Sequence, residues 1–220
     1  EHMVSAINNR KKIVVYGIPN VDGLCAISSL ILVLKYLNAD IEYVVHDEAS
    51  DKSKIMSEDI INNVHFLGGE LLIALGIDLK SKEEEYRYKN LSISGLTFKL
   101  MQAIATYYNI KSINKYLDLI LIGEKWESTP KKGENFIFIK EGMKFLINTN
   151  NYGLRSIMDF YNMIVINDES INKIIDVITP TINVVTMTDN ARIIIELLIT
   201  NRKERAEQIT KYLNKSKENV

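Results

Sequence analysis

The stretch KIVVYGIPNVDGLCAISSLILVLKYL, residues 12–37, joins two different apolar patterns through a short polar loop. Residues 12–17 (KIVVYG) form a β-branched apolar run that stops at a glycine and a proline, and they predict a buried strand. Residues 24–37 contain no helix breaker and predict a buried helix. Residues 41–46 (IEYVVH) repeat the strand pattern after a short turn. This order predicts a parallel strand-helix-strand unit of the α/β class.

The rest of the chain extends this unit and then becomes helical. Residues 64–67 predict a third strand, Gly68 and Gly69 its terminal loop, and residues 70–75 a short helix. Beyond the charged segment KSKEEEYRYKN, the apolar residues recur with a helical period. The predicted helices are residues 94–108 with Ser94 as N-cap, 113–123, 136–147, 171–178, 189–199 and 202–213, with a turn at 148–153.

These elements predict one domain over residues 4–213, with a small parallel, Rossmann-like sheet in an α/β part at about 11–80 and a helical part at about 90–213. Residues 1–3 (EHM) resemble a vector remnant, and residues 214–220 are expected to form a flexible tail.

Composition limits the classes of function. The 27 Lys and Arg residues nearly balance the 28 Asp and Glu residues, so no global positive field attracts nucleic acid. The single cysteine, Cys25, excludes an internal disulfide, and no apolar run is long enough for a membrane span. The expected location is therefore the cytoplasm, without a membrane partner.

The loop after the first strand, GIPNVDGLCA at residues 17–26, is where open α/β sheets place their sites. Asp22, followed by Gly23, is suited to ligate a metal ion. Its ordinary role at such a position is to cap the following helix. The loop alone leaves both roles open.

Four segments, in order, resemble the motifs of the RecJ-type DHH phosphoesterases. VVYGIPNVDGLCAISSLILVL (14–34) is similar to the first motif, where a strand ends in Gly-Asp-x-Asp-x-Asp-Gly before a helix. The other three are NLSISGLTFKLMQAI (90–104), LDLILIGEKWESTPKKGENFIFIKEGMKFL (117–146) and ITPTINVVTMTDNARIIIELLITNRKERAEQITKYL (178–213). The resemblance implies a DHH fold, and in the enzymes of this family it implies two Mn²⁺ or Mg²⁺ ions held by several Asp and His residues.

The same resemblance exposes departures at the positions of the metal ligands. Ile18 and Asn20 stand where the family has Asp, which leaves Asp22. Leu67-Gly68-Gly69 stands at the expected end of the third strand, and Gly76-Ile77-Asp78 does not continue to the Asp-His-His triplet. The changes in the later motifs are Glu127 for Asp, Thr181 for Arg and Thr186-Met187 for Gly-Arg. The sequence thus predicts a degenerate site with no catalytic residue, metal or cofactor, in which Asn20, Asp22 and Glu127 are vestigial positions.

Other segments permit weaker hypotheses. His46-Asp47-Glu48 offers metal-ligand types at a strand end, although a solvated strand terminus is the ordinary interpretation. Gly68-Gly69-Glu70 is better explained by a tight turn than by a phosphate loop. Trp126 suits either base stacking or partly buried packing. Lys131-Lys132 and residues 201–205 are typical of solvated faces.

Within the RecJ-like family, the resemblance extends to an archaeal branch that is related to the replication factor named cell-division-control protein forty-five and has lost the nuclease site. This implies a non-catalytic subunit that binds the GINS complex and, through it, the MCM helicase in a CMG-type assembly. Two alternatives remain open: an active metal-dependent single-strand exonuclease or oligonucleotide phosphoesterase, and a single-stranded DNA-binding replisome subunit with salt-dependent affinity.

Overall fold

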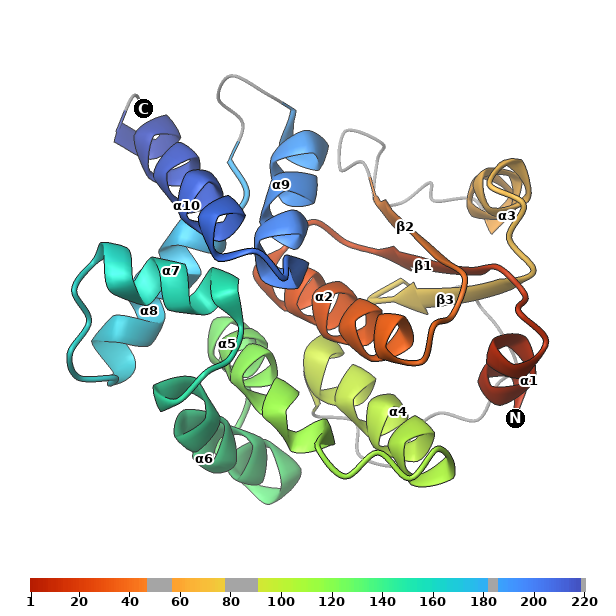
Figure 1. The fold of residues 1–220 in the computed structure, drawn as a ribbon, viewed down its shortest axis with the longest axis horizontal. Helices are drawn as coiled ribbons and strands as arrows, with labels where there is room; N and C mark the ends of the chain where they lie inside the picture. The colour runs from red at the N-terminus through yellow and green to blue at the C-terminus, as the bar shows by residue number, and fades with distance from the viewer. Residues whose placement is uncertain (47–56, 78–90, 182–185, 219–220) are drawn as a thin grey trace.

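A three-stranded parallel sheet lies on one side of the molecule, as seen in the computed structural model, which describes residues 1–46, 57–77, 91–181 and 186–218 (Figure 1). The strands are β1 (Ile13–Gly17), β2 (Ile41–Val45) and β3 (Leu71–Leu75), in the order β2-β1-β3. Ile13 pairs with Ile41 on one side and with Leu71 on the other. All five residues of β1 are buried, as expected of a central parallel strand. The predicted parallel α/β fold is confirmed.

Helix α2 (Val21–Tyr36) packs on one face of the sheet, and α3 (Ser57–Phe66) lies on the other. Because side chains alternate along a strand, Ile13 and Val15 join the main core with α2. Val14 and Tyr16 join a smaller cluster with Ile60 and Val64 of α3. The predicted helix after β1 is confirmed, and it begins three residues earlier than the pattern suggested.

The third strand was predicted in the wrong place. Residues 64–67, predicted as a strand, contain the end of α3 and the turn after it, and Leu71–Leu75, predicted as a helix, is β3. Ile60 and Val64 are one helical turn apart and are both buried, which fixes the helical period there. A run of five apolar residues is compatible with either structure, and pairing with β1 decides for the strand.

The other regular elements of the described chain are helices. The predicted helical C-terminal half is confirmed, with boundaries that differ by a few residues. The elements are α1 (His2–Asn8), α4 (Ile93–Tyr107), the 3₁₀ turn η2 (Ile113–Tyr116), α5 (Leu117–Glu127), α6 (Gly133–Ile147), α7 (Tyr152–Phe160), α8 (Asp168–Ile178), α9 (Met187–Ile199) and α10 (Lys203–Glu218).

Two boundaries correct the sequence interpretation, and helices α1 and α7 were not predicted. The N-cap of α4 is Ser92 rather than Ser94, because the Ser92 side chain accepts a hydrogen bond from the amide of Gly95. Helix α7 begins at Tyr152, inside the predicted turn. Helix α10 continues to Glu218, so most of the predicted flexible tail is helical. Helix α1 begins at His2, within the segment that resembles a vector remnant.

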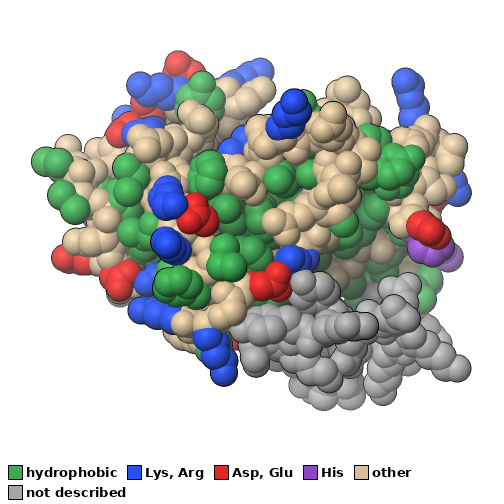
Figure 2. All heavy atoms as spheres, turned by 90° about the horizontal axis from the view of Figure 1, so that it is seen from below, with side chains coloured by type: hydrophobic (Ala, Val, Ile, Leu, Met, Phe, Trp, Pro, Cys, Tyr) green, Lys and Arg blue, Asp and Glu red, His purple; other side chains and the backbone are tan. Residues whose placement is uncertain are grey.

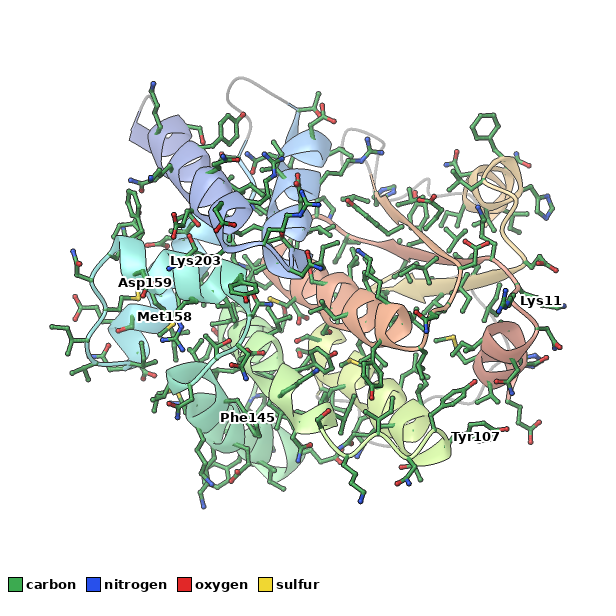
Figure 3. The ribbon with its side chains drawn as sticks, viewed as in Figure 1. Lys11, Tyr107, Phe145, Met158, Asp159 and Lys203 are labelled. Atoms are coloured by element: carbon green, nitrogen blue, oxygen red, sulfur yellow. The ribbon has the colours of Figure 1, made fainter. Side chains whose placement is uncertain are left out.

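Helix α2 lies between the sheet and the other helices, since it contacts α4, α5 and α9 as well as β1. Helices α7 and α10 lie side by side near Met158, Asp159 and Lys203 (Figure 3). None of the helices in the described ranges is both long and apolar enough to cross a membrane.

Candidate functional site

The candidate site lies beyond the carboxyl end of β1, where the N-termini of α2 and α4 converge. Asn20 is the N-cap of α2, and its Oδ1 accepts a hydrogen bond of 2.7 Å from the amide of Gly23. The residue that holds the first turn of α2 is therefore Asn20, not Asp22. An amide side chain is sufficient for this role, because capping requires only an acceptor oxygen.

Asp22 is completely buried and serves a different helix. Its Oδ2 accepts a hydrogen bond of 2.7 Å from the amide of Ile93, and its Oδ1 accepts one of 2.9 Å from the amide of Ser94. Both amides belong to the first turn of α4, which has no partners for them within the helix. Asp22 therefore fastens the start of α4 to the start of α2, and its negative charge lies at the positive end of the α4 dipole.

Glu124 of α5 is also buried and joins Asp22 through two serines. The Ser92 hydroxyl donates to Glu124 Oε1 at 2.8 Å, and the hydroxyls of Ser92 and Ser94 lie 3.0 Å apart. Thr129 donates its hydroxyl to the other carboxylate oxygen of Glu124. We call Asp22, Ser92, Ser94, Glu124 and Thr129 the Asp22–Glu124 network. It connects α2, α4 and the end of α5.

The two carboxylates of the network accept hydrogen bonds from neutral groups. Burial is the main cause that raises the pKa of Asp22, and hydrogen bonds from Ser94 and Ile93 oppose this rise. Burial also raises the pKa of Glu124, and the charge of Asp22 adds to the effect, while Thr129 and Ser92 oppose it. In the described part of the chain, no Lys, Arg or His forms an ion pair with either group.

Sequence reasoning singled out Glu127 and missed Glu124. Glu127 is the last residue of α5 and is exposed, whereas Glu124, one helical turn earlier, is buried beside Asp22. Burial, followed by the charge of Asp22, raises the pKa of Glu127, so the two carboxylates still interact electrostatically. The available signal for Glu124 was an acidic residue that closely follows the apolar run Leu119–Ile122.

Gly123 allows α5 to approach the network closely. A Cβ atom at this position would lie 2.2 Å from Ser94 Oγ and 2.5 Å from Asp22 Oδ1. We therefore expect Gly123→Ala to lower the free energy of unfolding by about 2 kcal/mol, measured by urea denaturation, because the network must shift. Helix propensity alone favours alanine over glycine. A variant at least as stable as the wild type would contradict this packing.

The other sequence candidates do not converge on the network. His46 is buried and its Nδ1 lies 3.1 Å from the Tyr16 hydroxyl, while Asp47 and Glu48 lie outside the described residues. Gly68 has a φ of +71° in the turn between α3 and β3, so this glycine pair connects a helix to a strand. Trp126 is half-buried and packs against the main core.

The later motif positions also have structural roles. The Thr181 amide donates to Asn190 Oδ1 at 3.2 Å, and Thr186 is the N-cap of α9. Lys131 and Lys132 are exposed before α6. Arg205, within the basic run 201–205, is paired with Glu196.

Because β3 lies later in the sequence than predicted, the residues that follow the third strand also differ from the prediction. The third strand ends at Leu75 and not at Leu67, so the residues that follow it are Gly76-Ile77-Asp78. The sequence therefore does provide a carboxylate shortly after the third strand. Asp78 lies outside the described residues.

Comparison with known proteins identifies similarity in structure alone. No family model matches the sequence, and no curated protein matches it. The exonuclease RecJ bound to manganese has a TM-score of 0.83 and 17% identity, over 99% of this chain and 64% of that one. RecJ from Thermus thermophilus in complex with Mn²⁺ has a TM-score of 0.75 and 16% identity, over 99% of this chain and 36% of that one. Its Mg²⁺ complex has a TM-score of 0.73 and 18% identity, over 99% and 33%.

The described residues of this chain do not fit the metal ions of those structures. Mn²⁺ and Mg²⁺ require several oxygen ligands arranged around each ion. Here both oxygens of Asp22 accept main-chain hydrogen bonds, and those of Glu124 accept hydroxyl hydrogen bonds. Within the described ranges, no group of three or more His, Cys, Asp or Glu residues is placed to hold a metal. Over nearly its whole length, the chain has the fold of the RecJ exonucleases, of whose chains it spans less than two thirds.

Proposed function

We propose that this chain is a non-catalytic DNA replication factor that binds the GINS complex and supports the MCM helicase. The single observation that carries the proposal is the use of Asp22. Its carboxylate, at the position of the retained metal-site residue, caps α4 from a fully buried position. A side chain committed to holding two helices together contributes to stability rather than to phosphodiester hydrolysis.

The surface charge supports a protein partner. The formal net charge is −1 at pH 7. On the face shown in Figure 2, Lys and Arg side chains are interspersed with Asp and Glu, and hydrophobic side chains lie between them. A mixed face of this kind attracts phosphates less than a continuous positive surface does.

The choice of GINS and MCM rests on the resemblance to the archaeal RecJ-like branch. That branch retains the RecJ scaffold without its nuclease site, and this chain combines a RecJ-like fold with a carboxylate network in place of metal ligands. The partners follow from this combination by analogy.

Co-purification tests the proposed partners. The untagged protein is isolated from its native extract at moderate salt, and associated proteins are identified by mass spectrometry. We expect GINS subunits in stoichiometric amounts and MCM subunits in smaller amounts. A preparation that contains neither would refute the proposed function.

One observation favours an active phosphoesterase as a second candidate. Each of the three strands is followed in sequence by an Asp, namely Asp22 after β1, Asp47 after β2 and Asp78 after β3. Carboxyl ends of neighbouring parallel strands meet at one edge of a sheet, where ligands bind. This candidate predicts tight Mn²⁺ binding and turnover that both depend on Asp22 and Asp78.

A further inference from the structure

Three adjoining hollows form a groove near the opposite end of α2 from Asp22. They have volumes of about 210, 600 and 460 Å³ and share residues of the α9–α10 connection, above all Thr200 and Asn201. Their other walls are the end of α2, η2, the start of α7 and the start of α10. We call this feature the helix-end groove. Tyr36 at its edge is roughly 21 Å along α2 from Asp22, at 1.5 Å per residue.

Tyrosine side chains line the groove. Tyr36 is 61% exposed and Tyr152 is 42% exposed, while Tyr116 is partly buried. The Lys115 Nζ lies 5.8 Å from the ring centroid of Tyr36 and 4.9 Å from that of Tyr116. Exposed tyrosines around an apolar floor, which Leu32 and Leu198 supply, are typical of the centre of a protein interface.

The groove carries more exposed positive charge than exposed negative charge. Lys35, Lys115 and Arg202 line it, are exposed, and form no ion pair with a described carboxylate. Arg205, by contrast, is neutralised by Glu196, with Nε to Oε1 at 2.6 Å and Nη2 to Oε2 at 2.9 Å. Among the described lining residues, Glu204 is the exposed acid that forms no ion pair.

We infer that the helix-end groove binds an acidic peptide segment of a partner protein. The three cations attract acidic side chains, and the tyrosines and apolar floor accept an apolar side chain of the same segment. A nucleic acid strand is less well matched, because the chain has a net charge of −1 and so no wider positive field to hold a long run of phosphates, whereas a short acidic segment needs only the local cations. This inference rests on the proposed function, for which it supplies the binding surface and the chemistry of the partner.

Site-specific photo-crosslinking tests the inference on the full chain. A benzophenone amino acid replaces Tyr36 in one variant and Tyr107 in another, which is 62% exposed at the end of α4 and serves as the matched control. After irradiation in the native extract, crosslinked peptides are sequenced by mass spectrometry. We expect the Tyr36 probe to capture one protein, through a segment of net negative charge, at least about tenfold more than the Tyr107 probe.

Charge reversal in the groove provides a second test of the inference. Lys115→Glu with Arg202→Glu is expected to reduce the Tyr36 crosslink about tenfold. Lys131→Glu with Lys140→Glu, which makes the same change in net charge at exposed positions around α6, should leave it unchanged. Equal capture by both probes, capture through a neutral or basic segment, or attachment to nucleic acid overturns the inference.

The two proposals fail in different ways. If GINS co-purifies equally with the wild type and with the Lys115→Glu, Arg202→Glu variant, the proposed function stands and the groove assignment is wrong. If neither GINS nor MCM co-purifies while the Tyr36 probe still captures an acidic segment of another protein, the groove assignment stands and the proposed function is wrong.

Discussion

Replacement of Asp22 by alanine is expected to lower the free energy of unfolding by about 4 kcal/mol, because two buried main-chain amides lose their acceptor. These amides, of Ile93 and Ser94, start α4 and lie 2.7 Å and 2.9 Å from the carboxylate oxygens. Burial of Asp22 opposes its ionisation, which is why its pKa is raised. Removing the carboxylate relieves the free-energy cost of burying it, but it leaves two buried amides without an acceptor. The second effect is the larger, as is usual when one partner of a buried polar pair is removed. Urea denaturation monitored by circular dichroism gives the value.

Two further variants serve as comparisons for Asp22→Ala. Asp22→Asn retains one good acceptor oxygen, so we expect roughly half of the loss. Asp176→Ala removes an exposed carboxylate of α8 and should change stability by less than about 0.5 kcal/mol. An Asp22→Ala protein as stable as the wild type would show that Asp22 does not fasten α4. That result is the one expected for a metal ligand, whose removal relieves repulsion in the metal-free protein.

The second large effect is a dependence of stability on pH that is centred on Asp118. This residue is 3% exposed, its Oδ1 accepts a hydrogen bond of 2.7 Å from the amide of Leu119, and its Oδ2 accepts one of 2.5 Å from the Thr149 hydroxyl. Burial raises its pKa from 3.8 to about 6, while the bond from Thr149 opposes the rise. Between these values the folded protein holds a proton that the unfolded chain has released. Raising the pH through this window therefore favours unfolding.

Comparison with Asp118→Asn isolates this contribution, because the asparagine has a similar shape and does not titrate. We expect the stability of the wild type relative to Asp118→Asn to fall by about 3 kcal/mol from about pH 3.5 to about pH 7. Other carboxyls with a raised pKa, such as Asp22 and Glu124, occur in both proteins and cancel in the difference. Urea denaturation across this range gives the measurement. Parallel pH profiles of the two proteins would refute the assignment.

The first strand and the helix after it were predictable because their signals are local. The strand at 13–17 and the helix after it follow from a β-branched run, a glycine and a long apolar segment without breakers. Residues 64–75 were not predictable in the same way. Their strand is defined by its pairing with β1, which lies far earlier in the chain, and a five-residue apolar run does not reveal such pairing.

The contacts of the candidate site were also hard to predict, because they join residues that are distant in the sequence. The sequence identified Asp22 by its position in the loop after β1, but its partners are Ile93 and Ser94, which are 71 and 72 residues away. Glu124 was missed for a related reason. Its burial depends on the serines of α4, and the motif comparison directed attention to Glu127, which α5 places one turn further on at the surface.

The carboxylates of Asp22 and Glu124 accept hydrogen bonds that hold helices together, and we expect them not to bind metal ions. Titration of the full chain with Mn²⁺ by calorimetry, combined with a single-strand exonuclease assay, tests this expectation most directly. A RecJ exonuclease serves as the positive control, and Asp176→Asn is the matched control for Asp22→Asn. We predict no Mn²⁺ binding tighter than about 1 μM and no turnover, with the same result for both variants. Stoichiometric Mn²⁺ binding below that value, together with cleavage that Asp22→Asn abolishes and Asp176→Asn preserves, would contradict the account.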